Sequence, residues 1–256
     1  MMDINKVYLG DCLEIMPSIP DKSIDMILCD LPYGTTACKW DTIIPLDPLW
    51  EQYKRIIKDN GAIVLTASQP FTSRLVMSNP EWFKHEWIWE KATGSNFATT
   101  KYMPMKEHEN ILVFGGGRLK YNPQLQERKG GGLKRVLSPY KSNTTVTNSV
   151  YGDFKTSVKG KNYNELRNPS SVQYFNNRED SRGLHPTQKP VALFEYLIKT
   201  YTNEGDLVLD NCAGSGTTGV ACQNLNRNYI LIEKEPKYYD IILKRLSEGQ
   251  PRLLDK

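Results

Sequence analysis

The sequence predicts an α/β domain whose parallel sheet is assembled in circularly permuted order. A strand, a glycine-rich turn, a helix and a second strand follow one another in residues 206–233, which is the order of a nucleotide-binding unit. This unit lies near the end of the 256 residues, so about one helix can follow it. One such unit cannot form a doubly wound sheet, because each parallel strand needs neighbours. The other strands must therefore come from the N-terminal part.

Five strands are expected before residue 115. They are the apolar runs at residues 6–9, 23–29, 62–66, 86–90 and 111–114. The periodicity between them predicts a short helix limited by prolines, an amphipathic helix and a third helix, at about residues 12–19, 49–58 and 71–77. Two further strands, at 207–209 and 229–232, and helices at 191–201 and 236–246 complete a seven-stranded sheet with its helices.

The turn after residues 207–209 has the composition of a nucleotide-binding loop. Asp210 stands at the end of the strand, and Gly214, Gly216 and Gly219 follow it. Glycines let the backbone approach a ligand closely, and the start of the next helix presents unpaired N–H groups. Glu233 ends the following strand, where a carboxylate is placed to accept hydrogen bonds from ribose hydroxyls. A plain packing turn is the alternative, and the combination of features favours the nucleotide site.

The bulk composition argues against a membrane protein and against a disulfide scaffold. No apolar run approaches the roughly 20 residues that span a bilayer, and the first residues lack a secretion-signal pattern. The five cysteines form no C-x-x-C pair and no metal-ligand spacing. We therefore expect reduced thiols, no metal site, no membrane partner and a cytoplasmic location.

Residues 115–183 form a basic segment attached to a mildly acidic body. They hold 13 Lys and Arg against 5 Asp and Glu, whereas the rest of the chain holds 20 against 24. Tyrosines and phenylalanines are interleaved with these basic residues. Phosphate contacts and base stacking by such a segment favour nucleic-acid binding, and a solvated insertion is the alternative. The chain is accordingly divided into residues 1–114, 115–183 and 184–256.

A second strand end also carries chemistry. Asp30-Leu31-Pro32-Tyr33 supplies a carboxylate, a main-chain carbonyl, a stiffening proline and an aromatic ring directly after the strand at 23–29. Two acceptors beside a stacking surface suit the exocyclic amine of a flat base, which must leave the DNA stack to be reached. Taken alone, the same four residues also suit an ordinary turn.

Taken together, the motifs resemble those of a known family. DLPYG, ENILVFGGG, a basic insertion, HPTQKP and DNCAGSGTT occur in this order, at residues 30–34, 109–117, 115–183, 185–190 and 210–218. This order resembles the permuted, beta-group DNA amino-methyltransferases. The resemblance implies a circularly permuted, Rossmann-like, seven-stranded methyltransferase sheet with helices on both faces. It also implies S-adenosylmethionine as methyl donor, double-stranded DNA as partner and the basic insertion as target-recognition region.

The resemblance assigns roles to individual residues. Asp30 and the carbonyl of Leu31 would accept hydrogen bonds from the target amine, Pro32 would stiffen the turn, and Tyr33 would stack on the flipped base. The cofactor would be held at its adenine by Asp11, at its ribose by Glu233, and at its methionine end by Thr187, Gln188, Lys189, Asp210, Ala213, Gly214, Gly216 and Thr217. Residues 1–114 would then be the catalytic half and residues 184–256 the cofactor-binding half.

The sequence departs from the family pattern at two places. Leu31 stands where the family more often has proline, which should be tolerated because the carbonyl is the working group. Asn211-Cys212 replaces a more usual Pro-Phe, for which we expect a local packing effect.

The leading aspartate of the catalytic turn favours N6-adenine as target, with N4-cytosine as the alternative. The chain has no Pro-Cys pair, which argues against carbon-5 methylation of cytosine by a thiolate nucleophile. A DNA-binding protein with an inactive methyltransferase fold is a second alternative. A nicotinamide dehydrogenase would explain the glycine loop and Glu233 and leave Asp30–Gly34 unexplained. The recognition sequence, a homodimer and a companion restriction endonuclease stay open.

Other chemically capable side chains are expected to be structural. His85 and His108 are interpreted as structural or surface residues, and His185 as a residue that shapes the cofactor-side turn. The tryptophans at 82, 87 and 89 are expected in the core. Trp40 follows the catalytic turn and is left open between the core and a role in closing over DNA or cofactor.

Overall fold

The computed structural model describes residues 2–36, 38, 41–128, 145–148, 152–155, 166–178 and 184–248. The chain forms two compact units, one of Met1–Asn122 with Ser171–Lys256 and one of Pro123–Ser170. Lys39 and Trp40 lie outside the described residues, as do Lys134 and Arg135 of the basic segment. The functional division at residues 115 and 183 stays a prediction, and residues 115–122 and 171–178 lie in the first unit.

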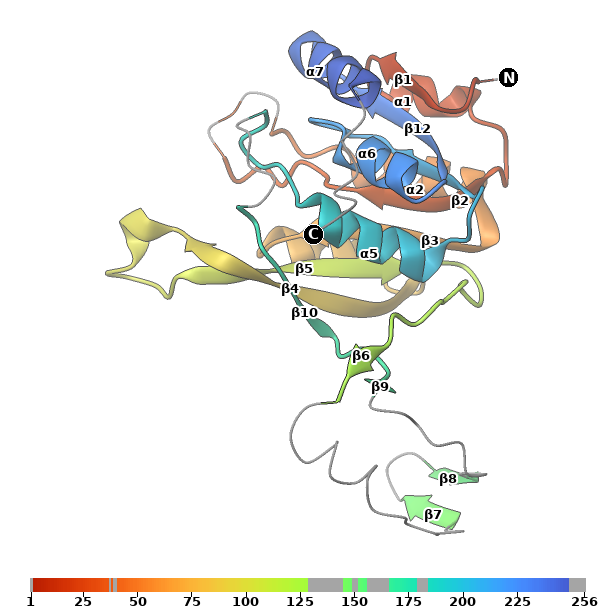
Figure 1. Cartoon of the computed structure of the whole chain (residues 1–256), viewed down its shortest axis with the longest axis vertical. Helices are drawn as coiled ribbons and strands as arrows, with labels where there is room; N and C mark the ends of the chain where they lie inside the picture. Colours follow the sequence, from red (N-terminus) through yellow and green to blue (C-terminus); the bar gives the residue numbers. More distant parts are fainter. Residues whose placement is uncertain are drawn as a thin grey trace. The chain divides into compact units, whose positions relative to one another are not determined.

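The first unit is built on an eight-stranded sheet with the order β1-β12-β11-β2-β3-β5-β4-β10 (Figure 1). The strands are β1 Lys6–Leu9, β2 Ile24–Cys29, β3 Ile57–Ala67, β4 Phe83–Ser95, β5 Lys106–Phe114, β10 Val172–Phe175, β11 Leu207–Asp210 and β12 Asn228–Glu233. β5 is antiparallel to both of its neighbours, and the other pairs are parallel. The C-terminal strands β11 and β12 lie between the N-terminal strands β1 and β2, so the permuted order predicted from the sequence is confirmed.

The main sheet has eight strands, one more than the seven predicted from the sequence. All seven expected strands are present, and β10 adds an eighth from within the segment predicted to be an insertion, pairing in parallel with β4. Its four residues alternate weakly and include the buried polar Gln173, so no apolar run marks them. β3 also starts earlier than expected, at Ile57, because the preceding helix ends at Ile56 and the strand continues through Asn60-Gly61.

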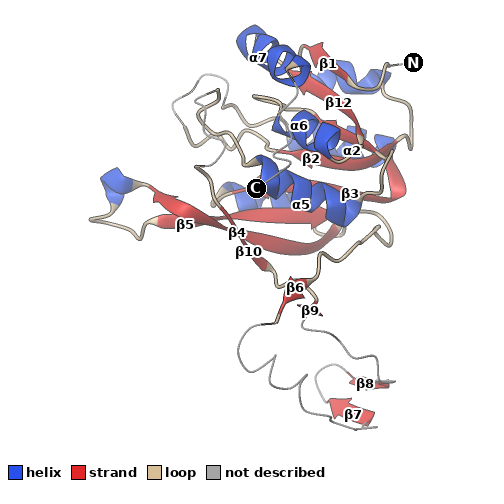
Figure 2. Cartoon of the chain, in the orientation of Figure 1, coloured by secondary structure: helices blue, strands red, loops and turns tan. Residues whose placement is uncertain are grey.

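Helices cover both faces of the sheet (Figure 2). They are α1 Cys12–Ile15, α2 Leu46–Ile56, α3 Phe71–Ser78, α5 Val191–Tyr201, α6 Thr217–Asn224 and α7 Pro236–Ser247, with short 3₁₀ turns η1 Met16–Ser18 and η2 Phe97–Thr99. Side chains of β2 alternate between two apolar layers, with Ile27 and Cys29 in one and Met26 and Leu28 in the other. The first layer contains residues of α1–α3 and the second contains residues of α5–α7.

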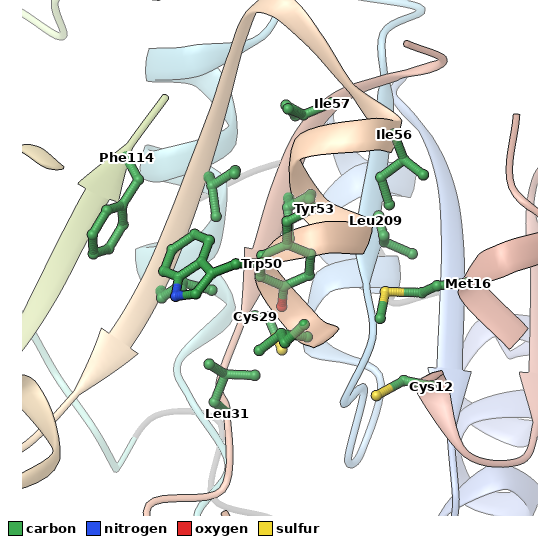
Figure 3. Close-up of a cluster of buried hydrophobic side chains, with 14 of the residues drawn as sticks. Cys12, Met16, Cys29, Leu31, Trp50, Tyr53, Ile56, Ile57, Phe114 and Leu209 are labelled. Carbon is green, nitrogen blue, oxygen red and sulfur yellow. The ribbon is translucent and has the colours of Figure 1, made fainter. Parts of the chain in front are cut away.

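Figure 3 shows part of the first layer, where Trp50 and Tyr53 of α2 pack toward Cys29, Leu31 and Phe114. Trp87 and Trp89 are 4% and 2% exposed in the structure, which confirms the expectation that they belong to the core. Trp82 is partly buried against the first layer. All five cysteines are free thiols. None of the helices among the described residues is long and apolar enough to cross a membrane.

The described residues of the second unit form two short antiparallel strand pairs. β6 Gln126–Glu127 pairs with β9 Leu166–Arg167, and β7 Thr145–Asn148 pairs with β8 Gly152–Lys155. Within the described part of this unit, the side chain of Arg128 donates a hydrogen bond to the carbonyl of Leu166 at 3.0 Å.

Candidate active site

A cavity of about 1070 Å³ lies where the parallel strands of the first unit end. Because β2, β11 and β12 run in the same direction, their last residues meet at one edge of the sheet. Asp30, Asp210 and Glu233 line the cavity together with the chain segments that follow them. Of the fourteen site residues predicted from the sequence, all line this cavity except Gly216. The structure therefore brings together site residues that are up to 222 positions apart in the chain, as Asp11 and Glu233 are.

Asp30 is held by hydrogen bonds on one oxygen and by an ion pair on the other. The hydroxyl of Tyr33 donates to Oδ1 of Asp30 at 2.8 Å, and the hydroxyl of Thr66, on β3, donates to the same oxygen. The ammonium of Lys189 lies 2.6 Å from Oδ2. Oδ1 accepts two hydrogen bonds and Oδ2 faces one donor, so Oδ2 is the oxygen of Asp30 with acceptor capacity left for a further donor.

The ring of Tyr33 packs against Phe71 in a stacked arrangement, with the ring centroids 5.3 Å apart and an interplanar angle of 24°. Lys189 Nζ lies over the same ring, 5.7 Å from its centroid. Burial and the neighbouring carboxylate of Asp30 raise the pKa of the Tyr33 hydroxyl well above its usual value. The hydroxyl therefore stays protonated and acts as a donor at neutral pH.

Lys189 was predicted to lie at the cofactor, and in the structure it forms an ion pair with Asp30. Its side chain is 6% exposed and is also 3.5 Å from Oε2 of Glu109, on β5. Burial lowers the pKa of Lys189, but the carboxylates of Asp30 and Glu109 more than reverse this, so the net shift is upward. Lys189 is therefore an ammonium ion enclosed by two carboxylates.

Glu109 and its partner Lys91 were not predicted as site residues, although both line the cavity. Lys91, on β4, donates a hydrogen bond to Oε1 of Glu109. The sequence signal was present, because Glu109 opens the ENILVF run. A carboxylate next to an apolar run usually lies in solvent at the end of a strand. Here β5 pairs with β4, and the side chain of Glu109 is enclosed.

The glycine loop is shaped by hydrogen bonds to the two strand-end carboxylates. Asp210 accepts from the N–H of Cys212 at 3.1 Å and from the hydroxyl of Thr218. Gly214 has the left-handed φ of +55° and donates its N–H to Oε2 of Glu233 at 2.7 Å. Burial raises the pKa of Asp210 to about 7. Through its bonds to Cys212 and Thr218, Asp210 holds the glycine loop in its conformation.

Gly216 is a packing position. It precedes α6 with a φ of +80°, and a Cβ atom there would lie 2.9 Å from a methyl of Ile242 on α7. Glycine is required at this point because the backbone is left-handed and the space is occupied.

Two further carboxylates that line the cavity keep acceptor capacity. Glu233 accepts from Gly214 and, through Oε1, from the N–H of Glu235 at 2.9 Å. Asp11 caps α1 by accepting from the N–H of Leu13 at 2.9 Å, and its other oxygen pairs with Lys234 at 2.9 Å. Each carboxylate oxygen accepts more than one hydrogen bond, so these contacts leave capacity for hydroxyl and amine donors of a nucleoside.

The HPTQKP segment is tied to the glycine loop. Ser215 donates to Oε1 of Gln188 at 3.0 Å, and Thr217 donates to the carbonyl of Lys189 at 3.3 Å. His185 accepts from the N–H of Thr187 at 3.3 Å. Burial lowers the pKa of His185 to about 4, so its ring is neutral at pH 7. The neutral ring can accept the hydrogen bond that holds this turn.

Asn211 was expected to affect local packing, and His85 and His108 were expected to be structural or surface residues. The hydroxyl of Tyr53 donates to Oδ1 of Asn211 at 2.6 Å, a buried bond that joins α2 to the glycine loop. His85 contacts the hydroxyl of Tyr201 at 2.7 Å, and His108 is exposed. Among the described residues, no group of three or more His, Cys, Asp or Glu side chains is placed to hold a metal ion.

The donor set and the size of the cavity fit a nucleoside with an amino-acid tail. The carboxylates of Asp11 and Glu233 suit ribose and base donors, and a Cβ atom at Gly214 would lie in ordinary contact with the ring of His185, at 3.7 Å. The enclosed ion pair of Asp30 and Lys189 lines the same cavity. These residues fit S-adenosylmethionine, the cofactor implied by the sequence.

Comparisons with known proteins also indicate a DNA methylase that uses S-adenosylmethionine. A family model described as DNA methylase, N6_N4_Mtase, matches residues 24–244. The type II methyltransferase M.HinfI of Haemophilus influenzae is 28% identical over 275 residues, which cover 97% of this chain and 70% of the relative. The type II methyltransferase M2.MboI of Moraxella bovis is 27% identical, with 96% of this chain and 89% of the relative covered.

Solved structures are similar over almost the whole chain. The M1.HpyAVI complex with SAM has a TM-score of 0.61 and 26% identity, and the similarity covers 94% of this chain and 99% of that one. The cytosine-N4-specific PvuII DNA methyltransferase has a TM-score of 0.66 and covers 95% of this chain and 86% of its own. Its 17% identity shows a common fold alone.

Proposed function

Because this chain belongs to the N6_N4_Mtase family of DNA methylases, we propose that its target is the N6 amine of an adenine flipped out of double-stranded DNA. The family and its fold confirm the predicted class, a DNA methyltransferase that uses S-adenosylmethionine. The nicotinamide dehydrogenase considered from the glycine loop is therefore set aside. The observation that carries the proposal is the position of Asp30, Leu31 and Tyr33 in the cavity that also contains the glycine loop.

The cofactor supplies a methyl group that is already activated on a sulfonium. The protein therefore has to place the amine in line with that methyl and to stabilise the charge that develops on nitrogen. Oδ2 of Asp30 and the carbonyl of Leu31 accept the two amine protons, which directs the nitrogen lone pair toward the methyl. Oδ1 keeps its bonds to Tyr33 and Thr66, and these hold the carboxylate in position.

We assign the cofactor to the other predicted residues that line the cavity. Glu233 takes the ribose hydroxyls and Asp11 the adenine, while Ala213, Gly214 and Thr217 form the wall at the methionine end. Asp210 and Gly216 act through the shape of the loop, as their contacts with Thr218 and Ile242 support. Thr187 and Gln188 close this end through the bond of Gln188 to Ser215.

Adenine is preferred over cytosine because the catalytic turn begins with aspartate, as in the adenine enzymes that it resembles. N4-cytosine is the second candidate, since both bases present an exocyclic amine to the same acceptors. Residues 115–183 are proposed as the target-recognition region, on the strength of their excess of basic over acidic residues. A restriction-modification setting with a companion endonuclease, and a cytoplasmic location, belong to the same proposal.

The test is methyl transfer from radiolabelled S-adenosylmethionine to mixed-sequence duplex DNA, followed by nucleoside digestion and mass analysis. N6-methyladenine is the expected product. N4-methylcytosine would keep the enzyme class and replace the base. No incorporation into DNA, with cofactor binding demonstrated, would favour a binding protein with an inactive fold.

A further inference from the structure

Four charged side chains form a continuous series across the cavity. Lys91 is bonded to Glu109, Glu109 faces Lys189, and Lys189 is paired with Asp30. The exposed fractions of these side chains are 10%, 13%, 6% and 22% in the order Lys91, Glu109, Lys189, Asp30. Since the four are enclosed together, their charges must be balanced within the series.

The two oxygens of Glu109 differ in their contacts. Oε1 accepts the hydrogen bond from Lys91. Oε2 is buried without a hydrogen bond, and the ammonium of Lys189 lies 3.5 Å away from it. A buried carboxylate oxygen without a donor is unfavourable, so it calls for an explanation. A small movement of the Lys189 ammonium toward Glu109 would satisfy it.

Binding of the target amine in the proposed reaction favours such a movement. Lys189 occupies Oδ2 of Asp30 at 2.6 Å, and this is the oxygen that the target amine needs. When the amine binds there, two donors share this oxygen, which weakens its bond to the buried ammonium. Weakening the ion pair of a buried charge is unfavourable, so a second acceptor within reach stabilises the ammonium.

We propose that Glu109 is a positioning residue, which takes over the ammonium of Lys189 when the target amine binds Oδ2 of Asp30. This inference rests on the proposed function of Asp30 as acceptor of an amine. Lys91 keeps Glu109 in place, because it holds Oε1 while Oε2 receives Lys189. Burial raises the pKa of Glu109, and the lysines around it more than reverse this, so the carboxylate is ionised at neutral pH.

The first experiment compares Glu109→Gln with Glu107→Gln in the full-length protein. Glu107 lies on the same strand and is exposed, so its variant loses the same charge outside the cavity. In Glu109→Gln, kcat for DNA methylation is expected to fall roughly 10- to 100-fold, the effect of losing a hydrogen bond to a charged group. The dissociation constant for S-adenosylmethionine, measured by calorimetry, is expected to stay within about 2-fold of the wild type. An unchanged kcat in Glu109→Gln would overturn the proposal.

Two further variants separate positioning from a structural effect. Glu109→Asp keeps the charge and is expected to recover at least part of kcat, whereas equal losses in Asp and Gln variants would contradict a role for the charge. In a Lys189→Met background, Glu109→Gln is expected to add less than about 2-fold, because residues that act through each other are not additive. A full, multiplicative loss would show that Glu109 acts independently of Lys189.

Failure of this inference and failure of the proposed function give different results. A wild-type protein that methylates neither adenine nor cytosine contradicts the function of Asp30. An active wild type whose Glu109→Gln variant is equally active contradicts only the role of Glu109. Thermal unfolding of each variant checks that the fold is kept. If Glu109→Gln fails to fold, kcat of Glu109→Asp is compared with that of the wild type instead.

Discussion

The two oxygens of Asp30 have different tasks, and this division makes its substitution informative. Oδ1 is fixed by Tyr33 and Thr66, whereas Oδ2 faces Lys189 inside the cavity. Asp11, the N-cap of α1, and Glu233, at the end of β12, are proposed to hold the cofactor, and separate hydrogen bonds fix them. Loss of the Asp30 carboxylate should therefore affect the reaction and leave the cofactor end unchanged.

In Asp30→Ala we expect kcat for methyl transfer to fall by roughly 100- to 1000-fold or more, the range for removing a group that stabilises transition-state charge. Cofactor affinity should change little, and calorimetric titration with S-adenosylmethionine measures it. Asp240→Ala removes an exposed carboxylate from α7 and is the control. A large loss of cofactor affinity in Asp30→Ala would contradict the assigned roles.

Asp210 makes stability depend on pH in a defined direction. Its pKa is raised by burial from 3.8 to about 7, so the folded state holds a proton that the unfolded state has released between these values. Its contribution to stability is complete below about pH 3.8 and is lost as the pH rises toward 7. In Asp210→Asn, unfolding free energy between pH 4 and 8 should fall less with rising pH than in the wild type. The difference is up to about 4 kcal/mol at 1.36 kcal/mol per pKa unit.

Urea unfolding at a series of pH values measures this difference. Asparagine has the shape of aspartate and an acceptor for the N–H of Cys212, but its amide nitrogen cannot accept from the hydroxyl of Thr218, so the slope with pH and not the absolute free energy is compared. Parallel pH curves for the two proteins would show that Asp210 is ionised in the folded state at all these pH values.

At the residue scale, sequence motifs identified the groups at the strand ends and missed their partners. Asp30, Asp210 and Glu233 each follow an apolar run, so their position at the edge of the sheet follows from the pattern. The pairing of Lys189 with Asp30 joins positions 159 apart in the chain, and no local pattern predicts it. Glu109 was missed for the same reason, because its burial depends on the neighbouring strand.

At the scale of elements, α7 packs directly on the turn that begins α6. Gly216 and Gly205 both have a φ of +80°, but a Cβ at Gly216 would lie 2.9 Å from Ile242, whereas at Gly205 nothing lies within 4 Å. The two glycines therefore form a matched pair, in which the backbone strain is the same and the packing differs.

We expect Gly205→Ala to lower the free energy of unfolding by about 1–2 kcal/mol, the strain of a left-handed alanine. Gly216→Ala should lower it by roughly a further 1–3 kcal/mol, because the added methyl forces Ile242 to move. Chemical denaturation of both variants measures the difference. Equal losses would show that α7 adjusts freely and that Gly216 serves the turn alone.

The elements that could be predicted are those with a strong apolar pattern of their own. The strands at β2, β11 and β12 are apolar runs buried on both sides, and all were expected. β10 was not, because an edge strand of four residues is stabilised by pairing with β4 and has no apolar pattern of its own. The early start of β3 has the same cause, since the pairing of Ile57 with Ile24 extends it beyond its apolar run.

At the scale of the whole molecule, the charge is distributed unevenly. Residues 115–183 carry a large excess of basic residues, while the rest of the chain is slightly acidic. A protein that binds DNA through phosphates releases counterions, so its affinity falls with salt in proportion to the number of phosphates it neutralises. If the basic segment makes these contacts, the salt dependence belongs to that segment and not to the net charge.

Charge reversal at Lys134 and Arg135 tests this on residues outside the described part of the structure. The double variant to Glu should weaken duplex binding, and the slope of log K against log salt should become shallower by about 1.8, since each phosphate contact contributes about 0.9. Reversal of Lys199 and Lys244, exposed on α5 and α7, changes the net charge equally and is the control. Fluorescence anisotropy between low and physiological salt gives both slopes. If the two variants lose the same slope, DNA responds to the overall charge, and the target-recognition role of residues 115–183 loses its electrostatic support.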